Sequence, residues 1–84
     1  MITVSVRFFG GREQFTRQLS REVAGNLPLV TLADDATVDD LLTVLSIPTG
    51  EGRPLISLNG FYQRANVALA DGDRVQLLKT VVGG

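Results

Sequence analysis

The chain has 84 residues, 44 % of them hydrophobic and 20 % charged, a size and composition that predict a single globular domain. It contains no cysteine and no histidine, which excludes disulfides, thiol nucleophiles and the usual zinc sites, so we expect no bound metal. Its formal net charge of −1, with no apolar run near the ~18 residues of a membrane span, predicts a cytoplasmic protein without nucleic-acid or membrane partners.

The first strand is predicted at residues 2–9, where hydrophobic and polar residues alternate. We expect one side of this strand to face the core, and that side carries Ile2, Val4, Val6 and Phe8. The other side carries Thr3, Ser5, Arg7 and Phe9.

A weaker helical pattern follows at residues 12–24. Its apolar stripe is narrow, with Phe15, Leu19 and Val23 spaced by four. Gly25 and Asn26 are typical of a helix end. We interpret the arginines in this segment as a solvated helix face.

The next strand, "LPLVTLA", precedes the strongest helical signal in the chain. Either Leu29 or Val30 is predicted to face inward, together with Leu32. Thr37 and Asp40 then form a capping-box pattern at the start of a helix. Its apolar stripe has the spacing of an amphipathic helix and consists of Val38, Leu41, Leu42 and Leu45.

The last third of the chain predicts strands joined by tight turns. "PLISLNG" reads as a strand closed by an Asn-Gly turn, and a short strand is expected at the start of "FYQRANVAL". "ADGD" is a turn, in which Asp71 and Asp73 are interpreted as turn formers rather than a metal site. The final strand, "RVQLLKTV", should point Val75 and Leu77 inward, and Gln76, Leu78 and Thr80 outward.

This order of elements predicts an α+β fold in which one good helix crosses a mixed sheet. The matched alternation of residues 2–9 and 74–81 indicates that the first and last strands lie side by side in its centre. One sheet face would pack on the helix at about Val38–Leu45, and the other would face solvent.

Three segments carry a resemblance to a known family: "DDATVDDLLTVL", "LISLNG" and "ALADGDRVQLLKTVVGG". They resemble the ubiquitin-like β-grasp sulfur carriers, which include the small subunit of molybdopterin synthase and the thiamine-thiazole sulfur carrier. The resemblance covers residues 2–9 and 31–84, and its most specific part is the "DGD" turn and strand followed by a terminal Gly-Gly. It implies a β-grasp roll of four to five strands with one main crossing helix, in a single domain over residues 1–84.

The same resemblance implies that the carboxylate of Gly84 is the reacting group. An E1-like enzyme would adenylate it with ATP, and a sulfur donor would then displace AMP and leave a thiocarboxylate on Gly84. The chain would be a protein co-substrate rather than an enzyme, with no cofactor of its own, because the activating partner uses the ATP. Gly83 and Gly84 suit this role because a residue without Cβ leaves the carbonyl unhindered.

The tail at residues 79–84 is expected to be flexible and to enter the partner's active site. Fully extended, it spans roughly 20 Å, at about 3.3–3.6 Å per residue. Lys79, Val81 and Val82 are predicted to contact the partner on the way. Mobility is expected at Val82, Gly83 and Gly84, which lack anchoring interactions.

Strand parity predicts where the partner docks. Leu78 should lie on the solvent face of the sheet, and so should Phe9, which has the opposite parity to Phe8. With the two strands adjacent, Leu78, Phe9 or Arg7, and Tyr62 would form an exposed apolar patch. The alternative is that Phe9 packs under the segment at 12–24 and Tyr62 covers the edge of the core.

Several functions fit the resemblance. We favour sulfur transfer in molybdenum or tungsten pterin cofactor synthesis, with a larger synthase subunit as a further partner. Thiamine-thiazole synthesis or another sulfur transfer is an alternative. So is a ubiquitin-like modifier whose Gly84 forms an isopeptide bond with lysine. The last alternative is a plain interaction module with an unused tail.

Overall fold

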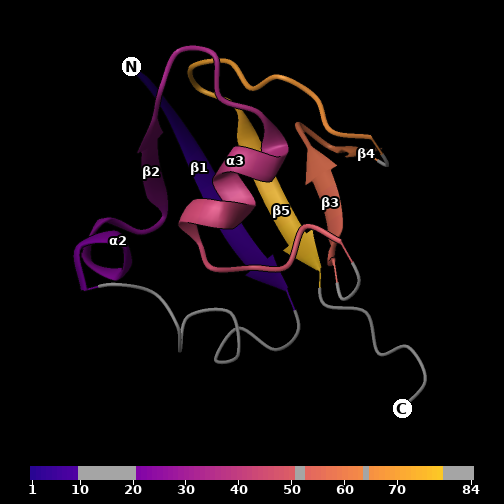
Figure 1. The fold of residues 1–84 in the computed structure, drawn as a ribbon, viewed down its shortest axis with the longest axis horizontal. Helices are drawn as coiled ribbons and strands as arrows, with labels where there is room; N and C mark the ends of the chain where they lie inside the picture. Colours follow the sequence, from indigo (N-terminus) through magenta and orange to yellow (C-terminus); the bar gives the residue numbers. More distant parts are fainter. Residues whose placement is uncertain (10–20, 51–52, 64, 79–84) are drawn as a thin grey trace.

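A computed structural model describes residues 1–9, 21–50, 53–63 and 65–78, which form a mixed five-stranded sheet and two helices. The strands are β1 (Ile2–Phe9), β2 (Leu29–Leu32), β3 (Leu55–Leu58), β4 (Phe61–Gln63) and β5 (Arg74–Leu78). The helices are α2 (Arg21–Asn26) and α3 (Val38–Val44). Figure 1 shows α3 lying across the sheet and α2 beside β2. The predicted α+β roll with one main crossing helix is confirmed.

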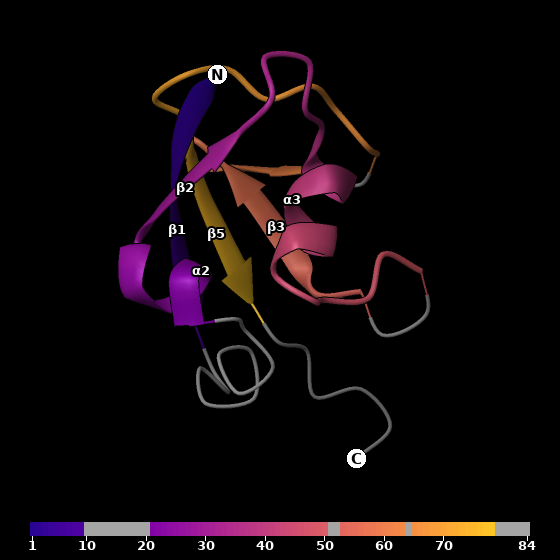
Figure 2. The ribbon, with the colours of Figure 1, turned by 60° about the vertical axis from the view of Figure 1, so that its left-hand side comes forward.

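The two strands nearest the chain ends lie side by side in the sheet, whose order is β2-β1-β5-β3-β4. β1 and β5 pair in parallel, with Val6 opposite Val75 and Phe8 opposite Leu77. β2 and β3 flank them as antiparallel neighbours. The prediction that the first and last strands are adjacent is therefore confirmed, and both end at the same edge of the sheet (Figures 1 and 2).

The core lies between the sheet and α3. The completely buried side chains come from the inward positions of the strands and the apolar stripe of the helix, and they include Val4, Val6, Val38, Leu41, Leu42, Leu45, Ile56, Val75 and Leu77. Full burial of one such side chain stabilises the fold by about 1.5–3 kcal/mol. Phe8 is partly buried against this cluster, so the predicted inward side of the first strand is confirmed.

α3 begins with the capping box that the sequence predicted. The Thr37 hydroxyl accepts a hydrogen bond from the Asp40 backbone N–H at 3.3 Å. The Asp40 carboxylate in turn accepts one from the Thr37 backbone N–H at 2.8 Å. The helix ends at Val44 with Leu45 as its C-cap, ahead of Pro48.

Two tight turns at one end of the sheet are tied together by the side chain of Asn59. Asn59 and Gly60 both have positive φ, 52° and 92°, as expected for the Asn-Gly turn between β3 and β4. The Asn59 side chain donates to Asp73 Oδ1 at 3.0 Å and accepts from the Arg74 N–H at 2.9 Å. The turn before β5 is thereby held against the turn after β3.

Asp71 and Asp73 are turn residues, as the sequence indicated. Asp71 Oδ1 accepts a hydrogen bond from the Thr3 N–H at 2.7 Å, and Asp73 Oδ2 accepts one from the Ala70 N–H at 2.7 Å. Gly72 between them has a φ of 86°. Within the described residues, no group of three acidic, histidine or cysteine side chains is placed to hold a metal ion.

The structure shows which residue of β2 faces the core, a point that the sequence left open between Leu29 and Val30. Val30 is buried while Leu29 is 52 % exposed, so Val30 is the inward residue of β2. The helix predicted at 12–24 is described only from Arg21, as part of α2, which ends at Asn26 as expected. The first part of the predicted helix, residues 12–20, and Thr80 lie outside the described residues. None of the described helices is long and apolar enough to cross a membrane.

Candidate functional site

The sheet side opposite α3, which we call the open face, carries the strand positions that alternate with the core residues. On the four strands β1, β5, β3 and β4, the register brings to this side Thr3, Ser5, Arg7, Phe9, Arg74, Gln76, Leu78, Leu55, Ser57 and Tyr62. The sequence reasoning placed Arg7, Phe9, Tyr62 and Leu78 here, and the structure brings all four to this face.

One end of the open face is an apolar patch formed by Phe9, Leu55, Tyr62 and Leu78. Leu78 is paired in register with Phe9 on one side and Leu55 on the other. Phe9, Leu55 and Tyr62 are 45, 48 and 67 % exposed. A shallow hollow of about 240 Å³ lies among Phe9, Tyr62 and Leu78, with the small side chain of Ser57 also lining it. Exposed aromatic and leucine side chains gathered in this way are typical of a protein-binding surface.

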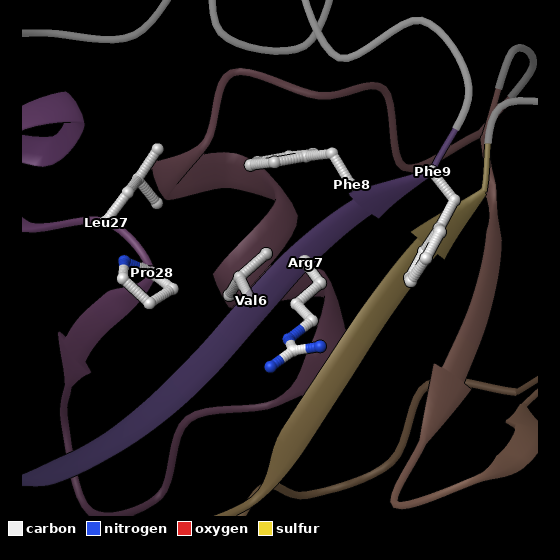
Figure 3. Close-up of a pocket in the computed structure, with 6 residues that line it drawn as sticks. All are labelled: Val6, Arg7, Phe8, Phe9, Leu27 and Pro28. Atoms are coloured by element: carbon white, nitrogen blue, oxygen red, sulfur yellow. The ribbon is translucent and has the colours of Figure 1, made fainter.

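Phe9 takes the orientation that strand parity predicted. Figure 3 shows its ring extending over β5, whereas Phe8 extends in the other direction, away from β5. Tyr62 is mostly exposed and sits opposite Ser57 in the β3–β4 pair. The alternative in which Tyr62 covers the edge of the core is therefore wrong.

Leu78 is half-buried rather than fully exposed, which corrects one expectation. The reason is that a wide side chain flanks it in each neighbouring strand, Phe9 in β1 and Leu55 in β3. Leu55 itself was not predicted as part of the patch. The signal was present in "LISL", because an inward Ile56 requires Leu55 to point outward.

Arg7 lies on the open face but not in the apolar patch. In the β1–β5 register it is opposite Gln76, two residues before the Phe9–Leu78 pair. It also borders a hollow of about 360 Å³ near the end of β1, whose other wall contains Leu27 and Pro28 (Figure 3). Arg7 is exposed and makes no ion pair with any of the described residues.

The tail residues that the sequence analysis assigned to the reaction and to contact with the partner lie outside the described residues. They are Lys79, Val81, Val82, Gly83 and Gly84. The same holds for the expected flexible tail as a whole. Leu78, the last described residue, lies inside the apolar patch. The candidate docking surface therefore includes the residue directly before that segment in the sequence.

The described residues of the apolar patch offer a contact surface. The chain contains no histidine or cysteine, and the patch is made of aromatic and aliphatic side chains. The chain combines a β-grasp roll with an apolar patch on its open face and, after Leu78, a segment that contains Gly83 and Gly84. These features define the class of small ubiquitin-like carrier domains.

Comparison with known families makes this assignment specific. The family model of the ThiS family matches residues 7–84, and the chain belongs to that family of β-grasp sulfur carriers. The match includes Arg7, the whole of β5 and both terminal glycines. A comparison with curated proteins gave no match.

Solved structures with the same fold cover nearly the whole chain. Subunit 1 in a complex of subunits 1 and 2 of the molybdopterin-converting factor from Helicobacter pylori is 27 % identical, with a TM-score of 0.58 and coverage of 99 and 100 % of the two chains. A putative molybdopterin converting factor subunit 1 from Pyrococcus furiosus is 23 % identical, with a TM-score of 0.67 and coverage of 96 and 100 %. SAMP1 from Haloferax volcanii is 20 % identical, with a TM-score of 0.64 and coverage of 98 and 99 %.

Proposed function

We propose that this protein carries sulfur as a thiocarboxylate on Gly84 and serves as a co-substrate of other enzymes. The observation that carries the proposal is the match to the ThiS family, which continues through Gly83 and Gly84. The apolar patch supports it, because a carrier needs a surface by which its partners hold the body while the tail reacts. That surface surrounds Leu78, the last residue before the tail.

The proposed cycle has three steps. The Gly84 carboxylate attacks the α-phosphate of ATP in an E1-like enzyme, forming an acyl-adenylate and releasing pyrophosphate. A hydrosulfide-level sulfur donor then attacks the activated carbonyl carbon, so that a carbon–sulfur bond forms and AMP leaves. Transfer of this sulfur to an acceptor, with water supplying the replacement oxygen, returns the carboxylate.

This chain's own contribution is binding and presentation. The apolar patch would exclude water from the contact with the activating enzyme and fix the origin of the tail. Residues 79–82 would then lead to two glycines, which lack the Cβ that would crowd the reacting carbonyl. We propose no cofactor bound to the carrier, since ATP belongs to the activating partner.

The central test is ATP–pyrophosphate exchange with the E1-like enzyme of the same organism. Wild-type protein should support exchange. Deletion of Gly84, or conversion of its carboxylate to an amide, should abolish exchange while the thermal unfolding curve stays the same. Protein isolated from the native source should contain a fraction whose mass reports one oxygen exchanged for one sulfur. Exchange that survives deletion of Gly84 would contradict the carrier function.

We propose a pterin cofactor precursor as the sulfur acceptor, with a larger synthase subunit as partner. The similarity to subunit 1 of a molybdopterin-converting factor that is solved together with its subunit 2 supports this choice. The test is sulfur transfer from the purified thiocarboxylate, supplied in parallel to a pterin synthase large subunit and to a thiazole synthase. Turnover with the thiazole synthase alone would assign the chain to the thiamine branch.

A second candidate function is ubiquitin-like modification. Its support is the shared fold with the Haloferax volcanii small archaeal modifier protein 1, at a TM-score of 0.69 and 20 % identity. The same adenylated Gly84 would then be captured by a lysine amine, with AMP as the leaving group. Affinity-tagged protein expressed in the native host should in that case appear in higher-mass conjugates, each carrying a Gly-Gly remnant on lysine after proteolysis.

A further inference from the structure

The open face has a second part beyond the apolar patch, centred on two arginines. Arg7 in β1 is opposite Gln76 in β5, and Arg74 in β5 is opposite Ser5 in β1. The two arginines thus occupy diagonal positions on adjacent strands. Both are exposed, and both line one hollow of about 330 Å³, together with Ser5, Pro28, Asn59 and Gln76. We call this region the cationic hollow.

Within the described residues, no acidic side chain forms an ion pair with these arginines. The open-face positions of the five strands contain no aspartate or glutamate. The ion pairs found among the described residues join the N-terminus to Asp34 and Arg53 to Asp39. Glu22, on α2, borders a different hollow beside β2.

Asp73 precedes Arg74 in the sequence but is otherwise engaged. Its Oδ1 accepts from the Asn59 side chain and its Oδ2 from the Ala70 N–H. Among the described residues, then, neither Arg7 nor Arg74 is in an ion pair, and both line the hollow on the open face.

The cationic hollow and the apolar patch are close enough to belong to one interface. Along β5, Leu78, Gln76 and Arg74 follow one another on the open face, so Arg74 lies about 13 Å from Leu78 at about 3.3 Å per residue. Arg7 is two residues from Phe9 on β1, about 7 Å by the same spacing. A protein interface of ordinary size, about 800 Å² per partner, covers both regions.

We infer that the cationic hollow binds carboxylate side chains of the activating enzyme, beside the apolar contact made by the patch. The inference rests on the proposed function and specifies its partner's chemistry: aspartate or glutamate residues bordering an apolar surface. A guanidinium group is complementary to a carboxylate in geometry and opposite to it in charge. Pairing of opposite charges across an interface selects partners and speeds their encounter. A protein fits better than a polyphosphate ligand, because the adjoining patch of Phe9, Leu55, Tyr62 and Leu78 needs an apolar counterpart.

The test is the association rate with the E1-like enzyme, measured by stopped-flow fluorescence at low and high salt. The double variant Arg7→Glu with Arg74→Glu should associate at least about tenfold more slowly at low salt and lose most of the salt dependence. The variant with lysine at both positions should keep most of the rate. Arg21→Glu, at an exposed arginine on α2, makes the same charge change per residue and should alter the rate less than about twofold.

The outcomes separate this inference from the proposed function. If the glutamate variant associates like wild type, the cationic hollow has no role in docking, while exchange at Gly84 still supports the carrier. If wild-type protein neither associates nor supports exchange, both proposals are wrong. Should the glutamate variant fail to fold, the glutamine variants at both positions take its place, with a rate loss expected in the same direction. Binding of short single-stranded RNA that only the wild type shows, with unchanged enzyme association, would also overturn the inference.

Discussion

Two residues at the start of α3, Thr37 and Asp40, cap the helix that packs on the core. Thr37 and Asp40 satisfy each other's backbone N–H groups, so four backbone and side-chain atoms act as one unit. Immediately after them, Val38, Leu41 and Leu42 are completely buried. A change at the cap therefore weakens the packing of the helix on the sheet.

We expect Thr37→Ala to lower the free energy of unfolding by about 1 kcal/mol, the usual effect of losing a helix cap. For a domain of this size that corresponds to a fall of about 4–8 °C in Tm. Thr37→Ser keeps the accepting oxygen and should stay close to wild type. Calorimetry of the three proteins checks this, and an unchanged Tm in the alanine variant would show that the capping box adds nothing.

Leu78→Asp tests the apolar patch. The new carboxylate would lie between Phe9 and Leu55, so we expect docking to the E1-like enzyme to weaken by about 2 kcal/mol or more. Because Leu78 is half-buried, unfolding free energy should also fall by about 1–2 kcal/mol. Phe61→Asp is the control, since Phe61 is 73 % exposed but pairs with Leu58, which packs on the core side. Equal loss of docking in both variants would argue against a localised patch.

At the scale of elements, the β3–β4 turn depends on backbone conformation. Gly60 has a φ of 92°, and a Cβ built there would meet nothing within 4 Å. Gly25, in α2, has equally open surroundings and no positive φ. Neither site has a steric cost, so substitutions at the two glycines differ only in the effect of the backbone conformation.

The expected results have opposite signs. Gly60→Ala should lower the unfolding free energy by about 1 kcal/mol or more, because alanine is strained at positive φ. Gly25→Ala should raise it by about 0.4–1 kcal/mol, since alanine is the better helix former. Urea unfolding of both variants measures the difference, and two effects of the same sign would contradict the turn conformation.

How far each element could be read from the sequence depends on whether its determinants are local. The capping box and the stripe of Val38, Leu41 and Leu42 lie within one segment, and both were predicted correctly. Leu55 and Arg74 were missed as open-face residues although local alternation indicates their side of the sheet. That Leu55 lies next to Leu78, and Arg74 next to Ser5, depends on pairing between β3, β5 and β1, which are far apart in the chain. The patch residues Phe9 and Leu78 could be predicted only because both strands alternate clearly.

For the whole molecule, the parallel pairing of β1 with β5 makes the fold depend on its last described strand. β5 contributes Val75 and Leu77, both completely buried, and has a hydrogen-bonded neighbour on each side. Without it, β3 and β4 would be separated from β1 and β2. The sheet order therefore predicts that no stable domain forms before β5 is present.

A chain shortened to residues 1–73 should be unfolded at all temperatures, whereas a chain lacking only Gly83 and Gly84 should melt like the full-length protein. Circular dichroism and amide proton dispersion in NMR spectra distinguish the two. A cooperative thermal transition in the shorter chain would show that β5 adds to a core that forms without it.

The pairing of Phe9 with Leu78 also means that the proposed docking surface is assembled from the first and last strands together. The two residues are 69 positions apart in the sequence, so they meet only when β1 and β5 pair. A misfolded or unfolded chain therefore does not present both side chains on one surface, even when its Gly84 carboxylate is chemically intact. On the proposed function, recognition through this surface restricts the use of ATP to folded molecules, so that the docking step also serves as a check on the quality of the carrier.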